Sequence, residues 1–174
     1  MAKQKMVKCR YPKCSMMHAT TEMPKDEAYA DGKGKYYHPD CYHTMQTVNQ
    51  IRDLFYKEIN PMMTGQQIGQ LVSIVNNMIF SKHIDVDMIL FSLQYFIKNK
   101  PGKLRYPGGM AYIVQDRDVL TAWERKQKSK IKSELQGLKS STLISDEFTM
   151  DDLQEKSSFV YKPQKQTSFA DILK

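Results

Sequence analysis

The chain has 174 residues, 41% hydrophobic and 26% charged, which suits one ordinary domain or a small module with a compact second domain. No run of about 18 apolar residues occurs, and no apolar stretch follows the basic start, so we expect neither a membrane-spanning helix nor a secretory signal. The net charge of +7 lies almost wholly in residues 98–132, which carry ten Lys or Arg against three Asp or Glu. We therefore expect a cytoplasmic protein, outside membranes, whose basic segment can face a polyanion.

The first predicted module, residues 1–44, contains all three cysteines and is rich in Lys, Tyr, Pro and Gly but poor in periodicity. An odd number of clustered cysteines without a secretory signal indicates metal binding more than a disulfide framework. Residues 31–35, Asp-Gly-Lys-Gly-Lys, have the composition of a tight turn, with short strands expected on both sides. The module is thus predicted to be a small β-hairpin organised by a metal.

Two short-range pairs of residues can supply the ligands. The first has Cys-x4-Cys spacing, and the second has His-x2-Cys spacing at the start of a predicted helix. Zinc favours four such ligands in a tetrahedron, and the nearby lysines and arginines favour the thiolate forms. The predicted ligands are Cys9, Cys14, His38 and Cys41. His43 and His18 are alternatives to His38 for the fourth position.

Four protein ligands leave a zinc ion no open coordination position. Such an ion is structural, because it has no bound water to activate for hydrolysis. The sequence also contains no recognisable set of nucleophile, base and orienting residue. We therefore expect a structural zinc ion and a protein that is not an enzyme.

The segment 36–42, Tyr-Tyr-His-Pro-Asp-Cys-Tyr, resembles the aromatic, His-x2-Cys, aromatic signature of LIM and PARP-type zinc fingers. In those families a cysteine pair precedes a hairpin, and the His-x2-Cys pair lies where a strand meets a helix. The first pair differs, since it is spaced Cys-x4-Cys here and Cys-x2-Cys in those families. LIM fingers bind proteins and PARP-type fingers bind DNA ends, so the resemblance implies a finger fold without choosing a partner.

The middle of the chain, residues 45–132, is predicted to be helical. Three- and four-residue spacing of apolar side chains predicts a helix over 39–59 and two more within 64–98, with Thr64 and Asp85 as N-caps. A loop with two prolines and three glycines follows, and residues 110–114 are either a short strand or the start of a helix. Asp116 or Asp118 opens a last helix that runs to residue 132. The fold class is therefore mainly α, with the N-terminal zinc-finger hairpin.

The basic segment combines mobile cations with aromatic side chains, a combination that suits phosphate contacts and base stacking. Val119, Leu120 and Trp123 also make the segment similar to the end of the carboxyl-terminal domain of DnaD-like replication proteins, although Gln115 stands where that family has a tyrosine. This similarity implies a basic DNA-binding tail behind the tryptophan. The predicted nucleic-acid contacts are Lys98, Lys100, Lys103, Arg105, Trp123, Arg125, Lys126, Lys128, Lys130 and Lys132.

Residues 133–174 are acidic and polar, and we expect a flexible tail. Two apolar islands, at 158–161 and 168–173, could dock onto a protein. We expect a zinc-finger accessory protein that binds nucleic acid. The alternative is an adaptor or inhibitor that binds a host protein through the finger or through residues 158–173. The size and the Met-, Asn- and Lys-rich composition resemble those of small phage or mobile-element proteins, which implies replication, recombination or regulation.

Overall fold

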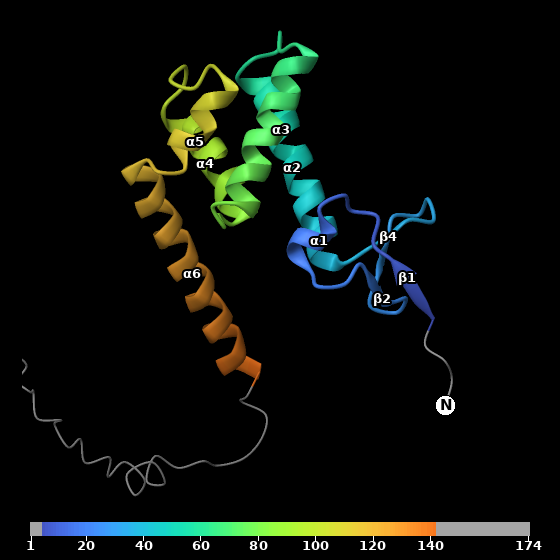
Figure 1. Cartoon of the computed structure of the whole chain (residues 1–174). Coiled ribbons are helices and arrows are strands. Elements are labelled where there is room, and N and C mark those ends of the chain that lie inside the picture. The colour runs from blue at the N-terminus through green and yellow to red at the C-terminus, as the bar shows by residue number, and fades with distance from the viewer. Residues whose placement is uncertain (1–4, 142–174) are drawn as a thin grey trace, which may run out of the picture. The chain divides into compact units, whose positions relative to one another are not determined.

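The computed structural model of the chain describes residues 5–141, and this part is mostly helical (Figure 1). The chain divides after Lys130 into two units, and the first of them contains the strands and nearly all of the helices. Its strands are β1 (Met6–Lys8), β2 (Glu22–Pro24), β3 (Tyr29–Ala30) and β4 (Tyr36–Tyr37). Its helices are α1 (Cys14–Met17), α2 (Pro39–Glu58), α3 (Gly65–Phe80), α4 (Val86–Asn99), the 3-10 turn η1 (Pro107–Gly109), α5 (Met110–Ile113) and α6 (Arg117–Ser141), which continues into the second unit.

The N-terminal module has two small antiparallel sheets, β1 with β2 and β3 with β4. The predicted hairpin is confirmed, and Asp31 holds its turn by accepting hydrogen bonds from the backbone N–H groups of Lys33 (2.8 Å) and Lys35 (3.1 Å). Gly32 and Gly34 have positive φ angles of 74° and 78°, which glycine adopts without strain. The sheet β1–β2 and helix α1 were not predicted, because three- and four-residue elements carry no readable periodicity.

The predicted helices of the middle segment are confirmed, together with their caps. Thr64 forms a capping box with Gln67, and the Asp85 carboxylate accepts a hydrogen bond from the backbone N–H of Asp87. Of the two residues considered for the last helix, Asp116 is the cap, since its Oδ1 accepts from the N–H groups of Asp118 (3.0 Å) and Val119 (3.4 Å). These caps satisfy backbone donors that the first helical turn leaves unpaired.

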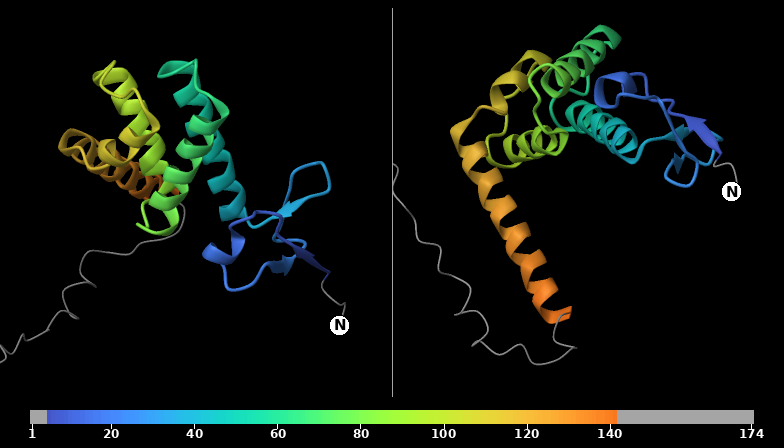
Figure 2. Two further views of the ribbon diagram at one scale, coloured as in Figure 1. Left: turned by 45° about the horizontal axis from the view of Figure 1, so that its top comes forward. Right: turned by 60° about the horizontal axis from the view of Figure 1, so that its bottom comes forward.

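Helix α2 packs against both α3 and α4, and Figure 2 shows the three helices side by side. Their apolar side chains contribute most of the main hydrophobic core. The side chains that are wholly buried in this core are Ile51, Phe55, Leu71, Val75, Ile89, Leu93, Met110 and Val119. A second, smaller cluster lies around the cysteines, and Met45 of α2 and Phe80 of α3 pack against it. The N-terminal module therefore packs against the beginning of α2 and the end of α3.

The segment after α4 settles one open alternative and extends one predicted element. Residues 110–113 are helical, which decides between the strand and the helix. The turn before them brings Gly109 close to the side chain of Leu104, so a Cβ at position 109 would require that side chain to shift. Helix α6 continues beyond residue 132 to Ser141, so it crosses the expected start of the tail. The islands 158–161 and 168–173 lie outside the described residues.

No helix within residues 5–141 is both long enough and apolar enough to cross a lipid bilayer.

Candidate metal centre

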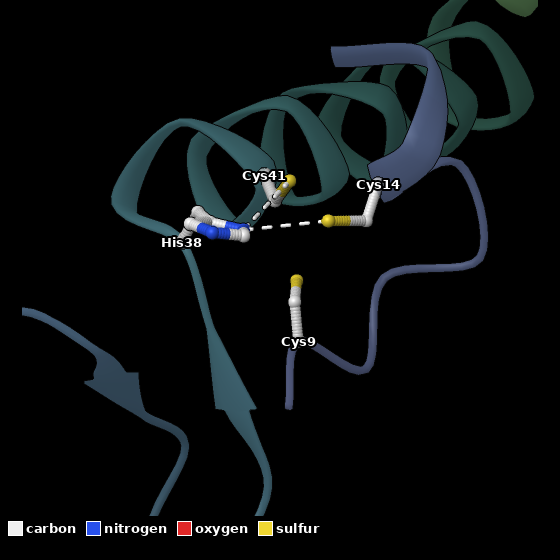
Figure 3. Close-up of side chains that lie close together, drawn as sticks. All are labelled: Cys9, Cys14, His38 and Cys41. Carbon is white, nitrogen blue, oxygen red and sulfur yellow. Dashed lines mark hydrogen bonds between the residues drawn. The ribbon is translucent and has the colours of Figure 1, made fainter. Parts of the chain in front are cut away.

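Four different elements bring the four predicted ligands together (Figure 3). Cys9 follows β1, and Cys14 begins α1. His38 follows β4 and is the N-cap of α2, where its extended backbone (φ −60°, ψ 145°) turns the chain into the helix. Cys41 lies in the first turn of α2, behind Pro39, whose fixed φ suits that turn. The His-x2-Cys spacing thus spans a strand-to-helix junction, as the aromatic signature implied.

The ligand atoms of these residues all lie within 4.8 Å of one another. Nδ1 of His38 is 3.3 Å from Sγ of Cys14 and 3.9 Å from Sγ of Cys41. Figure 3 shows the three sulfur atoms and the imidazole pointing toward one common point. The three cysteines are free thiols and not disulfide-bonded, so all three sulfur atoms are available as donors. Three sulfur donors and one imidazole favour a soft or borderline transition metal over magnesium or calcium.

Burial shapes the electrostatics of the group. The exposed fractions are 5% for Cys9, 1% for Cys14 and 0% for Cys41. Burial raises the pKa values of the Cys14 and Cys41 thiols above their ordinary range, and the charge of the neighbouring Cys9 adds to the rise. Burial also lowers the pKa of His38, which keeps its imidazole neutral and able to donate a lone pair. A bound cation would offset the repulsion among the thiolates, because its charge attracts each of them.

The backbone around the first pair is held on both sides. The N–H of Cys9 donates to the carbonyl of Thr21 (2.7 Å), and the N–H of Arg10 donates to the carbonyl of Tyr36 (2.9 Å). Tyr11 is buried in the same knuckle, and burial raises the pKa of its phenol to about 12. The wide Cys-x4-Cys spacing is therefore accommodated by a short loop tied to both β-sheets and closed by the first turn of α1.

The structure distinguishes among the three histidines considered for the fourth position. His43 is exposed, and its Nε2 lies 3.0 Å from a carboxylate oxygen of Asp87 in α4, so it joins α2 to α4. His18 lies beside the site without joining the ligand cluster, and its ring stacks on that of His38 at a centroid distance of 3.9 Å. The only sequence signal that could have pointed to this place is its position four residues after Cys14.

The predicted nucleic-acid contacts fall on two elements and the loop between them. Lys98 lies in the last turn of α4, Lys103 and Arg105 lie in the following loop, and all three are exposed. Lys100 differs, because its ammonium group makes ion pairs of 2.8 Å with both Asp116 and Asp118. It serves the fold by joining the end of α4 to the start of α6.

The remaining predicted contacts lie on α6, beside a feature that the sequence did not reveal. Trp123 packs against Phe91 of α4 with 5.2 Å between ring centroids. Nζ of Lys126 lies over both rings, 5.0 Å from the centroid of Phe91 and 5.4 Å from that of Trp123. A hollow of about 160 Å³ opens here, and Gln94 and Gln127 also line it. We call this hollow the α4–α6 hollow.

Comparison with protein-family models, with curated proteins and with solved structures found no match to this chain. The Cys3His group is therefore assigned from its own geometry: it can hold a metal ion, in the manner of a zinc finger of no assigned type.

Proposed function

We propose that the Cys3His group holds a structural zinc ion and that the chain is a non-enzymatic zinc-finger protein that binds nucleic acid. The metal part rests on one observation, the convergence of four buried donors. In a tetrahedral zinc site with bonds of about 2.3 Å, the donor atoms lie about 3.8 Å apart. The separations of 3.3 and 3.9 Å and the limit of 4.8 Å bracket that value, so an ion fits with small side-chain movements. All four positions would then be filled by protein.

The nucleic-acid part rests on the charge of α6. Residues 125–132 carry five cations and no acid, and all five side chains are exposed. The cationic side chains on these two successive helical turns repel one another. A polyanion such as a phosphate backbone would offset that repulsion. Within the described residues, Arg125, Lys128 and Lys132 make no ion pair, and their spacing of three and four residues aligns them on one face.

The α4–α6 hollow supports the same proposal. It places aromatic surface, lysine side chains and two side-chain amides in one small space, together with the carboxylate of Asp87, which is paired with His43. Aromatic rings stack on bases, lysines contact phosphates, and amides bond to base edges.

The test is a titration of labelled single-stranded and duplex oligonucleotides with zinc-loaded protein, followed by fluorescence anisotropy at several salt concentrations. We expect the logarithm of the affinity to fall linearly with the logarithm of the salt concentration. A triple variant, Arg125→Gln, Lys128→Gln and Lys132→Gln, should bind more weakly. Its slope should be shallower by about 0.9 for each duplex phosphate that the variant no longer neutralises.

A matched control removes three cations elsewhere, Lys33→Gln, Lys57→Gln and Lys82→Gln, at exposed positions outside the basic segment. This control variant should retain nearly the full affinity. Equal losses in the two triple variants would indicate only a general charge effect. The complete absence of binding at low salt would contradict the proposal and favour the alternative, a protein–protein adaptor that uses the finger or residues 158–173.

A further inference from the structure

Helix α1 contacts the metal site at three points although it supplies one ligand. Cys14 begins the helix, and Sδ of Met17 lies 3.9 Å from Sγ of Cys41. His18, which follows the helix, stacks on the ligand His38 with 23° between the ring planes. The helical turn is closed by a hydrogen bond of 2.9 Å from the N–H of His18 to the carbonyl of Cys14, which ties the backbone of the stacking residue to that of the ligand.

The hydrogen bonds of His18 do not explain its place. Its Nε2 atom is buried and has no hydrogen-bond partner among the described residues. A buried polar atom without a partner costs free energy, so something else must favour the ring in this position. What the ring offers is its face, which covers the imidazole of His38 at a centroid distance of 3.9 Å.

His38, in turn, lacks the usual support of a metal-binding histidine. Such residues generally donate their second ring N–H to a carboxylate or carbonyl, which fixes the orientation of the ring. In the described part of the chain, the hydrogen-bond contacts of the His38 side chain join Nδ1 to Cys14 and Cys41 and involve no such acceptor. The orientation of the ring therefore depends on packing.

We propose that His18 is a positioning residue of the metal site: the face of its ring holds His38 with Nδ1 directed at the three sulfur atoms. The inference rests on the proposed zinc site and adds to it a residue that contributes shape and no donor atom. A flat side chain is required at position 18, whereas its nitrogen atoms are not.

Three variants of the full-length protein separate these contributions. His18→Phe keeps a flat ring and removes both nitrogens, His18→Gln keeps a polar nitrogen and removes the ring, and His18→Ala removes both. The affinity for zinc is measured by competition with a chromophoric chelator. The visible absorption of the cobalt(II)-substituted protein reports the ligand geometry, and circular dichroism confirms that the helices are formed.

We expect His18→Ala and His18→Gln to weaken zinc binding by roughly tenfold, the usual effect of losing a residue that orients a ligand, and to change the cobalt spectrum. His18→Phe should restore most of the affinity and the spectrum. His43→Ala is the matched control, since His43 contacts Asp87 and not the ligands, and it should bind zinc as the wild type does.

These measurements distinguish failure of the proposed metal site from failure of the proposed role of His18. If the wild type binds no zinc, both the proposed metal site and this inference are overturned. If the wild type binds zinc and His18→Ala binds it equally well, only the inference is overturned. Recovery by His18→Gln without recovery by His18→Phe would show that a nitrogen of His18 is needed, which also contradicts a role through stacking.

Discussion

At the scale of single residues, Cys41 is where the metal site and the helical fold meet. Its side chain is wholly buried, and it lies in the first turn of α2, the helix that carries Ile51 and Phe55 into the main core. The Cys41 thiol has a raised pKa because it is buried beside the Cys9 and Cys14 thiols. Without a bound cation, the three thiolates would repel one another. A shared cation would attract each of them and so offset that repulsion.

Replacement of Cys41 by serine tests this role. We expect Cys41→Ser to lower bound zinc from about one ion per chain to nearly none, because a hydroxyl is a much weaker zinc ligand than a thiolate. Elemental analysis of the purified protein measures the ratio. His43→Gln, two residues further along the same helix, is the control and should retain its zinc. Full zinc content in Cys41→Ser would contradict the assignment.

Also at this scale, Lys100 and Asp116 form an ion pair of 2.8 Å between partly buried side chains. The hydrogen bond to Asp116 raises the pKa of Lys100 to about 12, and the same contact lowers the pKa of Asp116 below its usual value. Asp116 also caps α6, so one carboxylate connects the helix start to the end of α4.

These pKa shifts predict a dependence of stability on pH. The stabilisation from Asp116 is complete above about pH 4, the usual carboxyl pKa, and it is lost as pH falls through the lower pKa of the folded state. The stabilisation from Lys100 is complete below about pH 10 and is lost as pH rises through about 12. Urea denaturation between pH 2 and 7 should show a smaller acid-induced loss in Lys100→Met than in the wild type. Lys82→Met, which removes an exposed lysine, is the control, and its acid-induced loss should match that of the wild type.

At the scale of elements, the N-caps connect local sequence to stability. Thr64 accepts a hydrogen bond from the N–H of Gln67, whose side chain accepts from the N–H of Thr64. We expect Thr64→Ala to lower the free energy of unfolding by about 1 kcal/mol, since it leaves the backbone N–H of Gln67 without its acceptor. Thr64→Ser retains the cap and should cost much less. Urea denaturation compares them, and equal losses in the two variants would attribute the effect to packing of the threonine methyl group.

The sequence-based predictions succeeded where the interactions join residues close together in the sequence. The helices and their caps were predictable because Thr64 and Asp85 act on residues two or three positions away. The clustering of Cys9, Cys14, His38 and Cys41 was predictable because the spacing within each pair is local and a tetrahedral metal site would need both pairs. The sequence did not predict the sheet β1–β2, whose register joins Val7 to Met23, or the pairing of Lys100 with Asp116. Each depends on long-range contacts that leave no periodic pattern.

At the scale of the whole molecule, the buried apolar residues of the described part of the chain form two clusters. The smaller one contains the three cysteines, with Tyr11, Met23 and Tyr37. We expect a cluster of this size to depend on a bound metal ion for its stability, as small metal-organised modules do. The larger one is formed by α2, α3, α4 and the segment from Leu104 to Val119, and it contains no metal ligand.

The distribution of residues provides a separate probe for each cluster. All three cysteines belong to the finger, and the single tryptophan, Trp123, packs against Phe91 in the helical part. A thiol reagent therefore reports on the finger alone. Tryptophan emission reports on the contact between α4 and α6.

Removal of the metal should affect the two clusters unequally. On addition of a strong chelator, we expect the three thiols to become rapidly reactive, because the finger loses the ion that links its elements. Trp123 emission and most of the helical circular dichroism signal should persist, since the larger core keeps its buried surface. The finger packs on Phe80, so the chelated protein should also unfold at a lower urea concentration. Readdition of zinc should protect the thiols again. If the chelator instead shifts the Trp123 emission to the red and removes the helical signal, the helical core itself depends on the metal.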